Sequence, residues 1–104
     1  MTVVSWLLAA LLLVVGVAHL VAPAKVEPLV PEWWPARRAT VYASGVAEVV
    51  IGIGLLVPAT RTWAAGVAVL MFLAYTHVHF EGRRLTSGVV NLGYAALALF
   101  VCLG

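Results

Sequence analysis

The first apolar stretch of the chain, VVSWLLAALLLVVGVAHLVA (residues 3–22), decides the fold class. Only Ser5 and His19 interrupt it, and a helix needs about 20 mostly apolar residues to cross the hydrocarbon core of a bilayer. Three further stretches of similar character follow, at residues 39–57, 63–80 and 85–103. Their apolar runs are continuous, whereas membrane β-strands alternate with a period of two over about ten residues. The sequence therefore predicts an all-α, multi-pass membrane domain of four transmembrane helices within residues 1–104.

The composition supports a membrane domain and excludes several other classes. Of the 104 residues, 64% are hydrophobic and 10% are charged, compared with about 25% charged residues in an average soluble domain. A short soluble monomer could not cover its surface with so few polar groups, and a disordered chain would be far less hydrophobic. The single cysteine, Cys102, excludes a disulfide scaffold. Six basic residues and a net charge of +2 do not form the basic patch of a nucleic-acid-binding protein.

The connections between the stretches predict how the helices are arranged. Residues 23–38 hold four of the five prolines together with Trp33 and Trp34, which is typical of an irregular segment at the headgroup level of a membrane. Residues 58–62 and 81–84 are long enough only for tight turns, which place consecutive helices antiparallel. We therefore expect an antiparallel bundle of four transmembrane helices with a Pro/Trp-rich interfacial loop between the first two.

The distribution of Lys and Arg predicts the orientation. The first and third connections carry five of the six basic residues, and the second carries only Arg61. By the positive-inside rule, the first and third connections face the cytoplasm and both termini lie outside, in a bacterial-type cytoplasmic (inner) membrane. Ala22-Pro23-Ala24 resembles the cleavage site of a signal peptide, but the length of the first stretch and the lack of a preceding Lys or Arg favour a retained helix.

Glu48 is the charged residue of the second stretch and lies near the expected midplane, where a bare carboxylate is costly. Ser44, Gly45 and Gly52 share its helical face, which is nearly free of bulky side chains. Two interpretations stay open. The face packs closely against another helix with Glu48 as an interhelical hydrogen-bonding group, or it borders a cavity in which the carboxyl orients a ligand or handles a proton.

Other polar residues lie in the same half of the bilayer. His19, His77 and Asn91 are near the cytoplasmic ends of their stretches, and Tyr42 either caps a cavity or marks the interface. We interpret six residues as candidates for one ligand cavity open toward the cytoplasm: Glu48, His19, His77, Ser44, Asn91 and Tyr42. At the opposite end, Arg61 is interpreted as an anchor whose charge reaches the headgroups.

His79 follows His77 by two residues, so on a regular helix the two side chains point in nearly opposite directions. We interpret His79 as a residue of the headgroup boundary. We expect no metal site, because the two histidines cannot share one ion on a regular helix. A haem held between His19 and His77 is conceivable, but nothing else in the sequence supports it and none is expected.

The residues also resemble a known family, the DoxX-like small membrane proteins. The resemblance covers about residues 16–75 and rests on Gly16-Val17-Ala18-His19-Leu20, Pro23, Val30-Pro31, Pro35, the stretch SGVAEVVIGIGLLVP (residues 44–58), Arg61 and Ala64-Ala65. It implies a four-helix membrane bundle linked with membrane redox and detoxification systems; the family takes its name from a subunit associated with thiosulfate:quinone oxidoreduction. By this resemblance His19, Glu48 and Arg61 match the family's characteristic polar residues, whereas the segments around His77 and Gly88 depart from its pattern.

The resemblance and the polar residues together predict an accessory subunit of a membrane redox system, with a site for quinone or another lipophilic ligand around Glu48 and His19. A quinone carbonyl needs hydrogen-bond donors, which His19 or a protonated Glu48 could supply. The sequence has no redox-cofactor motif, so electrons would come from a partner protein. Two alternatives stay open: a non-catalytic module that binds or transports a lipid or small molecule, and a structural subunit of a larger complex. The sequence also leaves open catalysis by the chain itself and homo-oligomers formed through glycine-rich faces.

Overall fold

The computed structural model describes residues 2–104 and is all-α. Four long helices make up most of the chain: α1 (Thr2–Val21), α3 (Arg37–Leu56), α4 (Arg61–Glu81) and α5 (Leu85–Leu103). Each is long and apolar enough to cross a membrane. Their ends differ from the expected ones by at most two residues. The expected loop at residues 23–38 contains two short helical turns, α2 (Pro23–Val26) and the 3-10 helix η1 (Glu27–Leu29).

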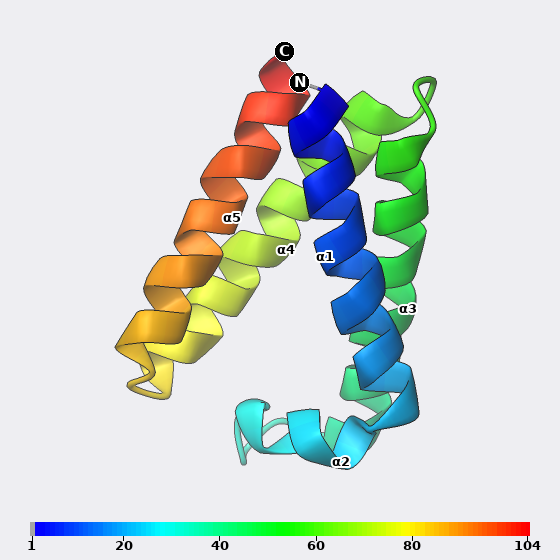
Figure 1. Ribbon diagram of the computed structural model, residues 1–104. Helices are drawn as coiled ribbons and strands as arrows, with labels where there is room; N and C mark the ends of the chain where they lie inside the picture. The colour runs from blue at the N-terminus through cyan, green and yellow to red at the C-terminus, as the bar shows by residue number, and fades with distance from the viewer. Residues whose placement is uncertain (1) are drawn as a thin grey trace.

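The four long helices form two pairs. α1 packs along α3 and α4 packs along α5, with fewer contacts between the pairs. Figure 1 shows the pairs converging at the end where both termini lie and spreading apart toward α2, which crosses the open end. The two pairs therefore form a V whose closed end carries the termini and whose open end faces α2. The two ends differ in how tightly they are packed.

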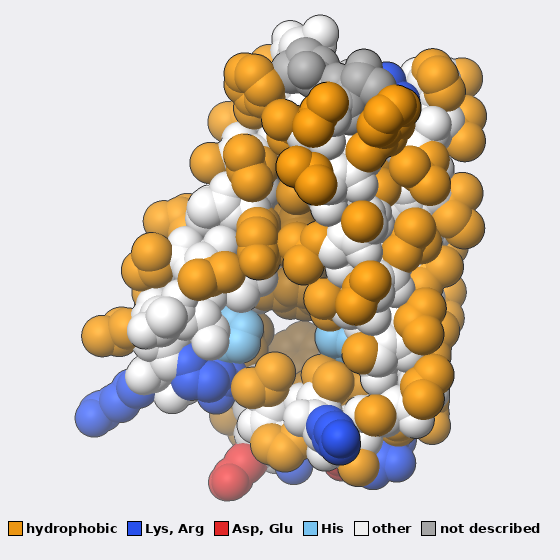
Figure 2. All heavy atoms as spheres, in the orientation of Figure 1, with side chains coloured by type: hydrophobic (Ala, Val, Ile, Leu, Met, Phe, Trp, Pro, Cys, Tyr) orange, Lys and Arg blue, Asp and Glu red, His pale blue; other side chains and the backbone are white. Residues whose placement is uncertain are grey.

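The converged end holds the hydrophobic core. Its members share very low exposure, and all but Phe72 have small or aliphatic side chains; they include Leu8, Ala9, Leu55, Ala65, Ala68 and Ala98. Alanines on α4 and α5 let the two pairs approach closely there, because a short side chain keeps the backbones near one another. The outer faces of the same helices are also apolar: Trp63 is 80% exposed and Leu70 is 69% exposed, and Figure 2 shows hydrophobic side chains over most of the visible surface.

Two glycines bring α1 and α3 into contact near the open end. A Cβ atom added to Gly16 would lie 2.9 Å from the carbonyl oxygen of Gly45, and one added to Gly45 would lie 3.0 Å from that of Gly16. Residues three apart share one face of a helix, so His19 and Glu48, each three residues after one of these glycines, face each other across the same contact. The close approach of the two backbones thus positions the polar pair described below.

The turn between α3 and α4 is held by side chains that donate hydrogen bonds to backbone carbonyls. The Nε of Arg61 donates a hydrogen bond to the carbonyl of Leu55 at 2.9 Å, and the hydroxyl of Thr60 donates to that of Gly54 at 2.9 Å. These carbonyls lie in the last turn of α3, which lacks helical donors for them. Arg61 is half-buried in this turn, and its Nε caps the end of α3; its role as an anchor at the headgroups stays a prediction.

Candidate functional site

A cavity of about 360 Å³ lies between the two helix pairs, at their open end. Its walls are mainly aliphatic and aromatic, with contributions from every helix and from the segment between α2 and α3. The side chains that carry polar atoms into this lining are His19, Trp34, Thr40, Ser44, Glu48, Tyr75, His79, Asn91 and Tyr94. An apolar enclosure with a few convergent polar groups is the usual form of a small-molecule site.

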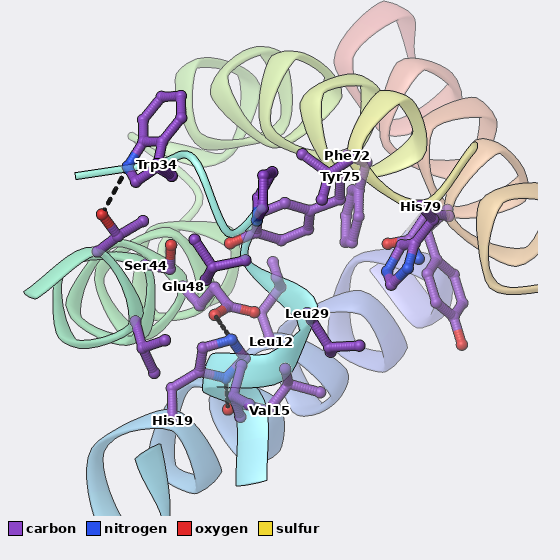
Figure 3. Close-up of a pocket in the computed structure, with 18 of the residues that line it drawn as sticks. Leu12, Val15, His19, Leu29, Trp34, Ser44, Glu48, Phe72, Tyr75 and His79 are labelled. Atoms are coloured by element: carbon purple, nitrogen blue, oxygen red, sulfur yellow. Dashed lines mark hydrogen bonds and ion pairs between the residues drawn. The ribbon is translucent and has the colours of Figure 1, made fainter. Parts of the chain in front are cut away.

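Glu48 is the most deeply buried charged residue of this lining, with 1% exposure. Its Oε1 lies 3.4 Å from the Nε2 of His19, and Figure 3 shows the two side chains pointing toward each other at the cavity wall. Within the described chain, Oε1 makes no hydrogen bond of good geometry. A carboxyl oxygen buried without a hydrogen bond is costly, and it therefore offers a bonding position to a molecule in the cavity.

The contacts of His19 restrict where its proton lies. Its Nδ1 is 2.7 Å from the carbonyl oxygen of Val15, and because a carbonyl can only accept, Nδ1 must carry a hydrogen. With Nδ1 protonated, two forms keep the pair neutral overall: a bare Nε2 beside a protonated carboxyl, and a protonated Nε2 beside a carboxylate. A neutral pair is the low-cost state for two buried ionisable groups.

Tyr75 brings α4 to the same point. Its side chain interacts with both Ser44 and Glu48 of α3, and Figure 3 shows its ring extending from α4 toward these two residues. Phe72, one turn earlier on α4, is 3% exposed and stacks at an angle on Tyr94 of α5, with ring centroids 5.4 Å apart. Aromatic rings thus form much of the wall that α4 and α5 contribute, and Tyr75 reaches from this wall to Glu48.

The segment from residue 23 to residue 36, here called the strap, crosses the open end of the cavity. On one side the guanidinium of Arg37 donates hydrogen bonds to the carbonyls of Glu27 and Val30, each at 2.9 Å. On the other side Arg84 donates to the carbonyl of Leu29 at 3.1 Å and to the Nδ1 of His79 at 2.9 Å. The strap is therefore tied to both helix pairs and closes the cavity from below in the view of Figure 1.

The structure brings four of the six expected ligand-binding residues together. His19, Ser44, Glu48 and Asn91 line the cavity, although the amide of Asn91 donates to the carbonyl of Ser87 in its own helix at 2.8 Å. The face that carries Glu48 both packs against another helix and borders a cavity, while a role of the carboxyl toward a ligand or proton stays a prediction. Gly45 and Gly52 pack against α1, whereas Ser44 and Glu48 line the cavity.

The structure does not place His77 and Tyr42 at the cavity. The side chain of His77 is 78% exposed and lies 3.2 Å from the carboxylate of Glu81, one turn later on α4. Tyr42 is 42% exposed and outside the lining. His79 takes the position that we expected for His77, because α4 continues to Glu81 and its inner face follows Phe72, Tyr75 and His79.

Five residues with polar atoms in the lining were not expected there from the sequence: Trp34, Thr40, Tyr75, His79 and Tyr94. Phe72, Tyr75 and His79 recur at i, i+3 and i+7, the spacing of one helical face, so this periodicity could have identified the two α4 residues. Trp34 donates a hydrogen bond from its indole to the hydroxyl of Thr40 at 2.8 Å. No local pattern indicates that contact, because it depends on how the strap folds back on α3.

Comparison with known proteins gives one finding. The model of a family described as a domain of unknown function, DUF8561, matches residues 8–85. No curated protein and no solved structure matches the chain. The matched residues include most of α1, the strap, α3 and α4, and with them His19, Glu48, Tyr75 and His79. The match covers most of the chain, which therefore belongs to the DUF8561 family.

Proposed function

We propose that the chain is a multi-pass protein of a bacterial-type cytoplasmic membrane, in which α1, α3, α4 and α5 form an antiparallel transmembrane bundle. Their apolar outer faces support this arrangement, since they would be costly in water and suit lipid. Five of the six basic residues lie on or beside the strap and the α4–α5 turn, and Arg61 lies at the other end. By the positive-inside rule the strap then faces the cytoplasm and both termini face outward.

We further propose that the cavity binds a lipophilic molecule with a carbonyl head, of which a quinone is the favoured class. The observation that carries this proposal is the buried Glu48 carboxyl, whose Oε1 lacks a hydrogen bond in the described chain and borders an otherwise apolar cavity. A protonated carboxyl or an imidazolium N–H would donate to a carbonyl oxygen. The aromatic wall of Phe72, Tyr75 and Tyr94 suits a flat ring.

The His19–Glu48 pair also suits proton-coupled chemistry. Reduction of a quinone to its quinol takes up two electrons and two protons, and the pair holds one proton at the carbonyl position. The second proton and both electrons must come from elsewhere, so the proposed role is an accessory subunit whose redox partner supplies the electrons. The resemblance to DoxX-like proteins supports the same role.

The first test is analysis of lipid extracts of the purified protein by mass spectrometry. We expect a quinone to co-purify with the native chain and with Glu48→Gln, which keeps a donor at this position. We expect Glu48→Leu to lose it, because an aliphatic side chain cannot bond to the carbonyl. Glu32→Leu is the matched control, since Glu32 is exposed and does not line this cavity. Equal quinone content in Glu48→Leu and the native chain would contradict the proposal.

The same extracts distinguish the alternatives. A bound lipid without redox chemistry would support a binding or transport module at the same cavity. A structural subunit is supported less, because Gly16, Gly45 and Gly52 are used in the contact between α1 and α3 and do not form an outward stripe for a partner. In a membrane preparation with its redox partner, Glu48→Gln should lower quinone reduction by about tenfold or more, the effect of losing a positioned proton donor.

A further inference from the structure

We infer that the cavity opens sideways into the hydrocarbon of the bilayer, through a window between α1 and α5. Its occupant is then a long-chain molecule whose carbonyl head lies at Glu48 and whose alkyl or prenyl chain leaves through the window. This inference rests on the proposed function, because it specifies the ligand of the same site. It concerns the part of the ligand that the polar pair does not contact.

The arrangement of α1 and α5 creates the window. The two helices approach each other near the chain termini and diverge toward α2 (Figure 1). Figure 2 shows a hollow between them, above α2, with a histidine side chain on each side. The surface around the hollow is largely apolar in this view, so a hydrocarbon chain that passes through it would remain in an apolar environment.

The exposure of the lining residues agrees with an opening at this place. On α1, Leu12 is 1% exposed and lies deep in the wall, whereas the lining residues Leu11 and Val15 are half-buried. On α5, the lining residues Asn91 and Tyr94 are also half-buried. Other lining residues are also exposed in part, among them Leu29 and Trp34 of the strap. We assign these four residues to the rim of the window because they lie on the two helices that flank the hollow.

The volume of the cavity argues that part of a long-chain ligand must lie outside it. A volume of about 360 Å³ is near the lower limit of small-molecule sites, which span about 300–1,000 Å³. It holds a substituted ring and the first part of a chain. The remainder of a chain needs an apolar path outward, and the window supplies one directly into lipid.

The strap closes the competing path toward the headgroups. A second cavity of about 360 Å³ lies against the strap and the α4–α5 turn and includes Glu32, Trp33, Glu81 and Arg84 in its lining. The hydrogen bond from Arg84 to Leu29 and that from the indole of Trp33 to Glu81, at 3.3 Å, hold the strap between the two cavities. Charged groups on this side make it a poor path for an alkyl chain.

Photolabelling tests the inference directly. The probe is a decyl benzoquinone that carries a diazirine at the end of its chain, applied to the native protein in lipid nanodiscs, with unlabelled decyl benzoquinone as competitor. We expect competed labels on the outward part of α1 and α5, near Leu11, Val15 and Tyr94. Competed labels on the strap or on residues 81–84 would overturn the window while leaving the proposed function intact. No competed labelling anywhere would overturn both.

A substitution at the rim provides an independent test. Val15→Trp should fill the window, and its matched control is Val14→Trp, on the neighbouring residue that is 69% exposed. We expect Val15→Trp to weaken binding of decyl benzoquinone by about tenfold or more and binding of the chain-free benzoquinone by less than about threefold, since only the chain needs the window. An equal effect on both probes, or no effect on either, would overturn the inference.

For the chain without an added tryptophan, binding of the two quinones can be followed by the fluorescence of Trp34, which lines the cavity. Trp6 and Trp63 are exposed and outside the cavity and are replaced by Phe in every variant that is compared, whereas Trp33 is kept because its indole helps to hold the strap. For Val15→Trp and Val14→Trp, whose new indole would add its own signal, binding is measured by displacement of the diazirine probe. A circular-dichroism spectrum matching that of the native chain shows that each variant is folded.

Discussion

The two ends of this molecule are built from the same four helices but differ in the size of the side chains between them. At the converged end α4 presents Ala64, Ala65 and Ala68, and the two pairs meet around Leu55. At the open end the same face of α4 presents Phe72 and Tyr75. Small residues let helices approach, whereas large rings hold the pairs apart. The change along one helix face therefore produces both a core and a cavity.

This difference also separates stability from binding. The converged end is filled by apolar side chains with almost no exposure, so substitutions there remove or displace packed atoms. The open end contains polar groups beside a cavity, so substitutions there change what the cavity can hold. Such a division is common, since sites that bind ligands rarely have the packing that is best for stability.

The largest expected effect is loss of packing at the converged end. Leu55 is 0% exposed, and Leu55→Ala should lower the free energy of unfolding by about 2–5 kcal/mol, the usual range for a buried Leu→Ala change. The comparison variant is Leu11→Ala at the rim of the cavity, where the lost atoms already border a void. Its effect should be clearly smaller. Thermal or denaturant unfolding in detergent measures both, and equal losses would contradict the difference between the two ends.

The contact between α1 and α3 can be tested by comparing alanine substitutions at two glycines, one inside the contact and one outside it. Gly45→Ala places a methyl group 2.8 Å from the Cβ of His19 and 3.0 Å from the carbonyl oxygen of Gly16, so it should destabilise the chain by about 1–3 kcal/mol through overpacking. Gly93→Ala meets nothing within 4 Å and should stabilise α5 by about 0.5–1 kcal/mol through helix propensity. Opposite signs are expected in the same unfolding assay. A stabilising Gly45→Ala would show that the two helices can separate without cost.

At the cavity, replacing buried polar side chains by aliphatic ones should raise the stability of the protein, whereas substitutions at the converged end should lower it. Glu48→Leu removes a buried carboxyl oxygen that has no hydrogen bond in the described chain and adds aliphatic surface next to Leu12. We expect the double variant Glu48→Leu, His19→Leu to make the ligand-free protein about 1 kcal/mol more stable, as when a whole buried ionic pair is replaced by apolar residues, while quinone binding is lost. Glu48→Leu alone leaves His19 without its partner at 3.4 Å and should be less stable than the double variant. A marked destabilisation of both variants would show that the pair serves packing and not a ligand.

The four long helices could be predicted from the sequence because each apolar run is continuous and long enough by itself. The meeting of His19 and Glu48 could be predicted only in part. Both residues lie three positions after a glycine, which indicates a shared close contact, yet which helices pair is set by the whole core. The DoxX-like resemblance, the quinone and the redox partner remain predictions.

The structure places His79 at the cavity where we expected His77, which shows what a local sequence pattern cannot predict. Two histidines two residues apart point in different directions, and only the rotation of α4 decides which one faces inward. Phe72 and Tyr75 set that rotation, but an aromatic stripe by itself is equally typical of an ordinary core. The contacts of the strap were beyond prediction for a different reason, since the bond from Arg84 to Leu29 joins residues 55 positions apart.

The smallest expected effect concerns the strap, which separates the open end from the headgroups. Arg84→Gln removes the hydrogen bonds to Leu29 and His79, and each such bond contributes about 1 kcal/mol or less in a partly exposed setting. Global unfolding should therefore change little, whereas amide hydrogen exchange of residues 23–36 should accelerate. Arg83→Gln is the matched control, because Arg83 is exposed and outside both cavities. If exchange of the strap is equal in the two variants, the Arg84 bonds do not hold it, and it depends on Arg37 and on the bond from Trp33 to Glu81.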